Sequence, residues 1–177
     1  MCADFINLTA ENLAEEHLCC IIRSRKAHPG VETKRRWLAE RLKEGHVFRK
    51  LDAKATAFVE YAPLEAAWVP IVGDNYIYIY SRGQRAKRTC SHVHLATAAR
   101  VKYPDACIGV FDCLWVLGDY KGKGYGKALM EYCLNDAEKM GRSGVCMLGA
   151  TKQKAWLSDQ SFAKKFGFET VDWTENG

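Results

Sequence analysis

Residues 120–127, Tyr-Lys-Gly-Lys-Gly-Tyr-Gly-Lys, place three glycines at alternate positions among three lysines. Glycine permits φ > 0 and keeps no side chain between the backbone and a ligand, so neighbouring N–H groups can converge on an anion. The apolar run 113–117 precedes the glycines and a segment with helical periodicity follows them. A helix N-terminus adds unpaired donors and about half a positive charge. Strand, glycine turn and helix together predict a pyrophosphate-binding site.

The spacing of this loop differs from two common phosphate loops. A Walker loop has Ser or Thr after its lysine, whereas Ala128 follows Lys127 here. A dinucleotide-binding loop spaces its glycines G-x-G-x-x-G, whereas Gly122, Gly124 and Gly126 are spaced G-x-G-x-G. The alternative without a ligand is a plain glycine turn with solvated lysines.

The loop resembles the acyl-CoA loop of the GNAT superfamily of N-acyltransferases, written [QR]-x-x-G-x-[GA]. Lys121 to Gly126 fits that pattern, with lysine in place of Gln or Arg. The resemblance runs from about Asp112 to Asp172: 114–116 resembles the family's fourth strand, and 163–168 resembles its fourth helix entering the next strand. The chain looks most similar to bacterial members that carry a further C-terminal domain.

This resemblance implies an enzyme that moves an acetyl or other acyl group from CoA to a primary amine. The amine would attack the thioester directly in a ternary complex, with acetyl-CoA as co-substrate and without a metal. Backbone groups of the fourth strand would bind the pantetheine and the carbonyl, and the glycine loop would bind the pyrophosphate. Carried over, the CoA-binding residues are Leu114, Trp115, Val116, Lys121, Gly122, Lys123, Gly124, Tyr125, Gly126 and Lys127.

Proton handling is less well marked in the sequence. An ammonium must lose a proton before it attacks, which favours a carboxylate nearby. Asp112 shares side-chain parity with Leu114 and Val116, and Glu60 lies on an earlier predicted strand, so both are candidate bases. Many family members protonate the thiolate with a tyrosine on the last helix. Ala163 occupies that place here, which leaves Ser161 or water.

The predicted fold is α/β: a GNAT-like, mixed, mostly antiparallel sheet flanked by about four helices. On the third predicted helix, Leu129, Cys133, Ala137 and Met140 share one face, and Gly141 suits its C-terminus. Together, periodicity and turn residues predict strands at 5–8, 47–51, 56–61, 76–80, 145–148 and 168–173, and helices at 9–22, 32–44, 124–140 and 158–167.

Two features depart from the family's pattern. About thirty residues separate the strand 76–80 from the loop's own strand, and six Lys or Arg against two Asp make 81–112 strongly basic. We expect the tyrosine-rich strand 76–80 to be an extra strand and 108–117 to form the complete fourth strand. The alternative is one fourth strand split by a basic loop. The final strand of the family's sheet also has no counterpart, so we expect a partner strand lost with a removed domain or supplied by another chain.

Composition limits the remaining classes. With 177 residues, 48% of them hydrophobic, we expect one acyltransferase domain over 1–177 with an atypical insert at 81–110. No stretch of about 20 apolar residues and no signal peptide is visible, and irregularly spaced cysteines suggest free thiols in the cytoplasm. We expect a small-molecule or peptide amine acceptor, no membrane or nucleic-acid partner, and a homo-oligomer through the incomplete sheet edge. The alternative function is a noncatalytic CoA-binding or basic interaction module.

Overall fold

A computed structural model of the chain describes residues 4–18, 29–52, 57–67, 69, 71–80, 93–95, 100–101, 115–116, 121–149 and 160–173. Its elements in chain order are β1 (Phe5–Asn7), α1 (Pro29–Leu42), β2 (Val47–Leu51), β3 (Ala57–Pro63), β4 (Ile71–Val72), β5 (Tyr76–Ile79), β6 (Val93–Leu95), β7 (Arg100–Val101), β8 (Trp115–Val116), α2 (Tyr125–Lys139), β9 (Gly144–Gly149), α3 (Gln160–Lys164) and β10 (Asp172–Trp173).

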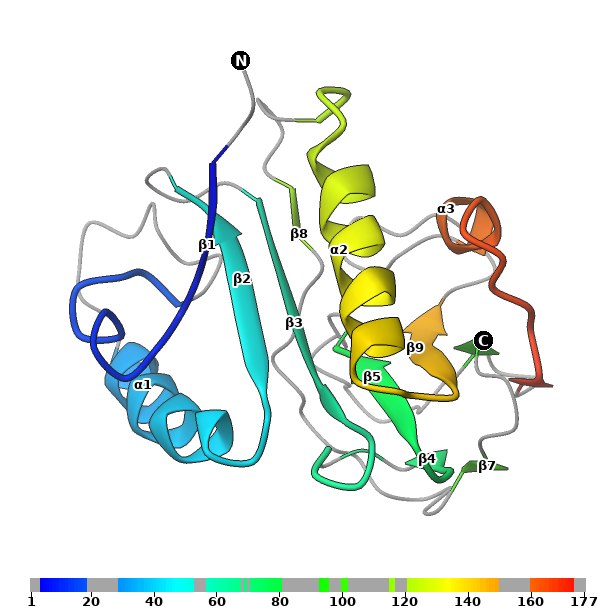
Figure 1. Cartoon of the computed structure of the whole chain (residues 1–177), viewed down its shortest axis with the longest axis horizontal. Helices are drawn as coiled ribbons and strands as arrows, with labels where there is room; N and C mark the ends of the chain where they lie inside the picture. Colours follow the sequence, from blue (N-terminus) through cyan, green and yellow to red (C-terminus); the bar gives the residue numbers. More distant parts are fainter. Residues whose placement is uncertain are drawn as a thin grey trace.

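One sheet joins strands from both ends of the described sequence. Its order is β1-β2-β3-β5-β9-β6-β10, with β8 also paired to β3 (Figure 1). All ladders in it are antiparallel except that between β5 and β9, which is parallel. The short strands β4 and β7 pair separately. This mixed, mostly antiparallel arrangement confirms the predicted fold class, and three helices lie among the described residues where about four were expected.

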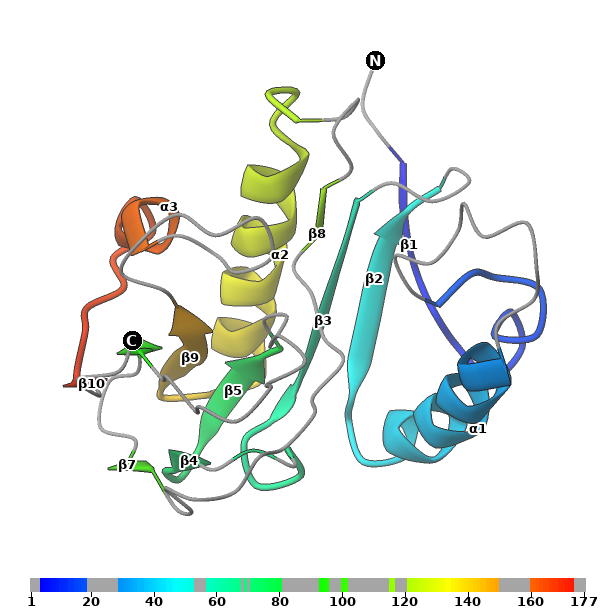
Figure 2. The ribbon, with the colours of Figure 1, turned by 180° about the vertical axis from the view of Figure 1, so that it is seen from behind.

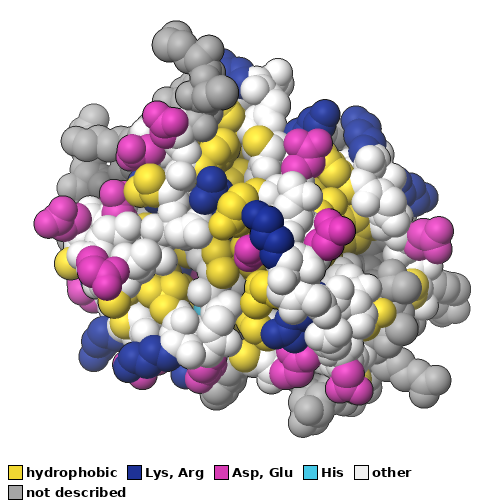
Figure 3. All heavy atoms as spheres, in the orientation of Figure 1, with side chains coloured by type: hydrophobic (Ala, Val, Ile, Leu, Met, Phe, Trp, Pro, Cys, Tyr) yellow, Lys and Arg dark blue, Asp and Glu magenta, His cyan; other side chains and the backbone are white. Residues whose placement is uncertain are grey.

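The helices α1 and α2 cover opposite faces of the sheet. Figure 1 shows α2 in front of β3 and β5, and Figure 2 shows α1 on the other face, beside β2. No helix within the described ranges is both long enough and apolar enough to cross a membrane. On the α2 face, basic and acidic side chains are interspersed rather than gathered in one patch (Figure 3).

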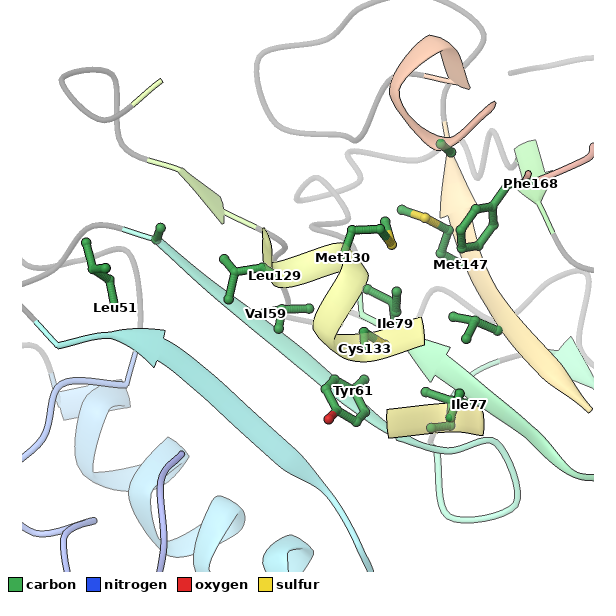
Figure 4. Packing of buried hydrophobic residues seen from close by; sticks show 14 residues of the cluster. Leu51, Val59, Tyr61, Ile77, Ile79, Leu129, Met130, Cys133, Met147 and Phe168 are labelled. Carbon is green, nitrogen blue, oxygen red and sulfur yellow. The ribbon is translucent and has the colours of Figure 1, made fainter. Parts of the chain in front are cut away.

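The core on the α2 face fixes the position of this helix. Leu129, Met130 and Cys133 point from α2 into the core that this helix shares with β3, β5 and β9, and each is completely buried (Figure 4). Met140 was expected on the same face, but it is 43% exposed because it lies just past the helix end. The core on the α1 face includes Leu38.

The fourth strand is split, contrary to our expectation. β5 pairs with β3 through Tyr61–Pro63, and β8 pairs with the same edge of β3 through Ala57 and Phe58. The N–H of Tyr80 still bonds to the carbonyl of Glu60. The tyrosine-rich strand is therefore the first part of the fourth strand rather than an extra one. A split strand in the middle of a sheet would leave backbone N–H and C=O groups of its neighbour unpaired. This cost is small here, because β5 and β8 together occupy almost all of the β3 edge.

Part of the insert belongs to the same sheet. β6 pairs antiparallel with β9 on one side and with β10 on the other. The partner of β10, which we expected to be lost or supplied by another chain, therefore comes from residues 93–95 of this chain. An oligomer through this edge stays a prediction, but the unpaired strand that motivated it now has a partner.

The predicted helix 9–22 is wrong over its described part. Residues 10–15 form turns and residue 16 a bend, with one backbone bond from Leu13 N to Thr9 O and another from Glu16 N to Asn12 O. The Asn12 side chain accepts from the N–H of Thr9, a local contact that closes the turn where the chain leaves β1. Arg35 of α1 donates to the carbonyls of Leu13 and Glu16, which a continuing helix would have used.

The C-terminal end of α2 shows how the helix stops and how it is held against the sheet. The chain leaves α2 through a Schellman motif, with Arg142 N bonded to Ala137 O and Gly141 in the left-handed region at φ 65°. In the last turn of the helix, the Tyr61 hydroxyl of β3 donates to Asp136 Oδ2 over 2.5 Å. Burial and this hydrogen bond raise the pKa of Tyr61, so the hydroxyl keeps its proton. The bond ties α2 to the central strand.

We predict that Tyr61→Phe lowers the free energy of unfolding by about 1–2 kcal/mol, because Asp136 loses a buried donor. The matched control is Tyr132→Phe, which removes a hydroxyl that accepts from Asn7 at an exposed position. That control should change stability by less than about 0.5 kcal/mol. Denaturant unfolding of the two variants measures both values, and equal losses would contradict the role given to Tyr61.

Candidate functional site

The predicted loop is an exposed turn between β8 and α2. Gly122 and Gly124 adopt φ of 76° and 83°, conformations that residues with a side chain rarely adopt. A Cβ atom built on either glycine meets no atom within 4 Å. Residues 121–124 are all exposed. The backbone of this turn therefore faces open space, as a loop that receives a ligand must.

The N-terminus of α2 has no side-chain cap from its N-cap residue. Gly124 is the N-cap residue and provides no side-chain hydrogen bond to the helix, and no acidic residue lies in the first turn. The first N–H groups of an α-helix have no partner within the helix and concentrate partial positive charge. Lys127, which is 68% exposed, lies 3.5 Å from Glu131 Oε1 in an i,i+4 pair. The helix end thus combines backbone donors with mobile positive charge.

Gly126 has a different environment from the other two glycines. A Cβ there would lie 3.6 Å from Val116 Cγ2 and 3.7 Å from Phe162 Cζ, in ordinary contact. The first turn of α2 therefore packs between strand β8 and helix α3. This contact places the loop directly beside the strand that we expect to hold the thioester.

Strand β8 has one edge paired and one edge without a described strand. Trp115 and Val116 lie opposite Phe58 and Ala57 of β3. Among the described strands, β8 pairs with β3 alone, because β9 pairs with β5 and β6 instead. The structure therefore places two of the three predicted strand residues beside the loop. Leu114 and the candidate base Asp112 lie outside the described residues.

The second candidate base, Glu60, lies inside the protein. Its side chain has no exposed surface, with Lys34 Nζ 2.6 Å from Oε2 and His46 Nε2 2.9 Å from Oε1. Burial alone would raise the pKa of Glu60, but the charge of Lys34 and the hydrogen bond to His46 outweigh it and hold that pKa below its ordinary value. Sequence reasoning missed His46 and Lys34, because neither has a sequence spacing that indicates a contact with Glu60.

The last helix offers no tyrosine at the predicted acid position. Ala163 has no exposed surface and belongs to the core under α2 and α3. A larger side chain at that position would meet the core and not solvent. Ser161, named as a substitute, is exposed on α3. The neighbour that does approach the loop is Phe162, which has no hydroxyl group.

A second polar cluster lies on the α1 face. Lys50 Nζ is 2.5 Å from Glu16 Oε2, and the Lys50 side chain is only 3% exposed. Next to this pair, His17 has a buried Nε2 without a hydrogen-bond partner in the described part of the chain. Burial and the charge of Lys50 lower the pKa of His17 to about 4. His17 is therefore neutral near pH 7.

The thiols that the structure describes are buried and form no disulfide. Cys133 and Cys146 are both free, as predicted from their inward positions, and burial raises the pKa of each thiol, to about 12 for Cys146. Within the described ranges, no three His, Cys, Asp or Glu side chains are close enough together to hold a metal ion.

Comparison with known proteins agrees with this arrangement. The family described as Acetyltransferase (GNAT) domain matches residues 73–170, which run from just before β5 to just before β10. The chain is also 32% identical over 168 residues to a protein of Bacillus subtilis named uncharacterized N-acetyltransferase YoaP. That match covers 95% of this chain and 54% of the relative, so the chain spans about half the relative's length. The chain belongs to the GNAT acetyltransferase family.

We predict that Gly126→Ala raises the free energy of unfolding by about 0.5–1 kcal/mol, because alanine favours the helix and its methyl group finds ordinary contacts. The contrasting control is Gly144→Ala, whose Cβ would lie 3.0 Å from Tyr76 Cε1 and should destabilise the protein. Thermal unfolding tests both. A destabilised Gly126→Ala variant would contradict the described packing of α2 against β8 and α3.

We also predict that stability falls as the pH drops from 6.5 toward 4. The pKa of His17 is lowered from 6.5 to about 4 in the folded state, so the unfolded chain binds more protons in this interval. His17→Gln should flatten this part of the curve of unfolding free energy against pH. An unchanged slope in the variant would show that His17 does not titrate as described.

Proposed function

We propose that this chain is an acyl-CoA-dependent N-acyltransferase that moves an acetyl or other acyl group to a primary amine by direct attack in a ternary complex. The observation that carries the proposal is the open, left-handed glycine turn at the N-terminus of α2, in a chain of the GNAT family. We treat residues 1–177 as one such domain. The free buried thiols suit a reducing cytoplasm, where CoA thioesters are available.

The pyrophosphate of acetyl-CoA is bound, in this proposal, by backbone N–H groups of residues 122–127. Fixed donors at a helix end stabilise an anion at little cost in reorganisation. Lys121, Lys123 and Lys127 add positive charge that salt can screen. The pantetheine then runs back from the loop along the free edge of β8. Backbone groups of 114–116 hold the thioester carbonyl, where negative charge develops during attack.

In direct attack by the amine, the protein mainly has to position the two substrates, because it forms no covalent intermediate itself. Holding the amine and the thioester in line removes much of the entropic barrier of a bimolecular reaction. The leaving thiolate needs no strong acid, since an ordinary thiol has a pKa of about 8.5. Water or Ser161 can therefore serve where the family tyrosine is replaced by Ala163. The acceptor's proton is the remaining requirement.

A noncatalytic CoA-binding or basic interaction module is the second candidate. It is favoured by Ala163, which provides no proton donor, and by the basic composition of 81–112. On the α2 face, however, charges of both signs are interspersed (Figure 3). An assay of CoA release from acetyl-CoA over a panel of primary amines separates the two functions. Binding of acetyl-CoA without turnover on any amine would favour the module.

We predict that Gly124→Ala weakens acetyl-CoA binding at least tenfold, a loss of about 1.4 kcal/mol measured by calorimetry. The new methyl group would occupy the open space assigned to the diphosphate. The matched control is Gly141→Ala at the other end of α2, where φ is also positive and a Cβ also meets no atom within 4 Å.

Both substitutions should destabilise the fold by about 1–2 kcal/mol, because both force alanine into the left-handed region. Only the change at Gly124 should alter affinity. Equal affinities of the two variants for acetyl-CoA would place the nucleotide elsewhere and contradict the proposal.

A further inference from the structure

The α1 face of the sheet encloses an ionic cluster that packing does not require. Glu60 on β3 is held between Lys34 of α1 and His46, with side-chain exposures of 0%, 15% and 2%. Removing charges from water costs several kcal/mol per ion, and an apolar group of similar size often packs equally well. Apolar packing of this kind occurs next to the cluster, where the rings of Phe48 and Phe58 stack with their centroids 5.0 Å apart. The cluster therefore calls for a role other than cohesion.

The register of the sheet puts this cluster next to the proposed reaction centre. Glu60 lies opposite Phe48 on β2, and its carbonyl accepts from Tyr80 N at the point where the fourth strand is interrupted. Phe58, two residues along β3 and about 7 Å away, lies opposite Trp115 of β8. The strand β8, whose free edge would hold the thioester, lies about one strand spacing, roughly 5 Å, from Phe58, two residues along β3 from Glu60.

The hydrogen bonds determine the tautomer of His46. Both Glu60 oxygens are engaged, and an ionised carboxylate only accepts, so the Nε2 of His46 must carry the hydrogen that it donates to Oε1. In the neutral ring, Nδ1 is then the atom able to take up a proton. A carboxylate behind a histidine stabilises the imidazolium that forms.

The surroundings of His46 contain few other titratable groups. The ring of Tyr80 lies 5.1 Å from its ring, and Trp37 of α1 lies edge-on at the same distance. Lys34 faces it across Glu60. Arg41 accepts from the His46 N–H with its carbonyl, while its guanidinium pairs with Glu44. His17 on the same face is not an equivalent candidate, because its Nε2 has no hydrogen-bond partner among the described residues and so no carboxylate is bonded to it.

We propose that His46 takes up the proton that the acceptor ammonium must lose, directly or through one water, with Glu60 as its positioning residue and Lys34 as the balancing charge. This inference rests on the proposed acyltransferase function. One N–H bond of the ammonium breaks and its proton binds Nδ1, and the freed nitrogen lone pair forms the new bond to the acyl carbon. As the C–S bond then breaks, a second N–H proton passes through water to the leaving sulfur, which gives the amide and the CoA thiol. The proton on Nδ1 then passes to solvent.

The test uses His46→Gln in the full chain, because the glutamine amide still donates to Glu60 but cannot take up a proton. With the protonated primary amine that turns over in the panel assay, kcat should fall about 100-fold or more. With hydroxylamine, which is unprotonated at neutral pH, the loss should stay below tenfold. The affinity for acetyl-CoA should not change. His17→Gln is the control and should leave the pH profile of kcat intact.

Equal losses with both acceptors, or an unchanged profile in His46→Gln, would overturn the assignment while leaving the proposed function standing. Acetyl-CoA binding without turnover on any amine would instead refute the enzyme itself, and this inference with it. If the variant fails to fold, nitrogen NMR of the wild-type protein still decides. A neutral Nε2–H tautomer of His46 at the pH of full activity is expected, and an Nδ1–H tautomer or a permanently charged ring would contradict the proposal.

Discussion

One edge of β3 carries the arrangement on which the proposed site depends. It binds β5 through its last residues and β8 through its first, so two segments far apart in the sequence form one interrupted strand. The parallel partner β9 follows β5 and then pairs with β6. Because β8 is left with one edge unpaired by any described strand, a ligand can bond to its backbone. The ladder that stabilises the sheet also exposes the groups proposed to hold the thioester.

The helix α2 positions the glycine loop relative to this ladder. Complete burial of Leu129, Met130 and Cys133 fixes its face, and the bond from Tyr61 to Asp136 adds a directional contact to β3. With the helix held at these points, its N-terminus lies beside β8, where Gly126 contacts Val116. The sites proposed for the pyrophosphate and the thioester are therefore not independent, because the contacts that fix both of them involve the same central strand, β3.

Local signals in the sequence predicted the elements whose determining residues lie close together in the chain. The glycine loop, α2 with its terminal Gly141, and the apolar strand β9 all appear where periodicity and turn residues placed them. The failures required long-range information. Nothing near residues 9–18 indicates that Arg35 would take two of its carbonyls, and nothing near Tyr76 indicates that β8 would continue the same edge of β3.

The candidate site divides in the same way. The loop was predictable because its chemistry lies in consecutive residues. The buried cluster was only partly predictable: Glu60 was named as a possible base, but Lys34 and His46 reach it from α1 and from the residue before β2. Their contacts depend on how the helix crosses the sheet, which no short motif encodes. Ala163 shows what a motif alignment leaves out: counting back from Gly167 identifies the position of the family's tyrosine, but it does not reveal that the side chain at this position faces the core.

The central claim is that main-chain amides of the loop bind the diphosphate of CoA. Proton–nitrogen NMR of the uniformly labelled protein, titrated with CoA, tests it most directly. The account predicts that the amide signals of Gly122, Gly124 and Gly126 move most, and that those of Gly141 and Gly167 stay in place. Saturable CoA binding with the three loop amides unmoved would contradict it.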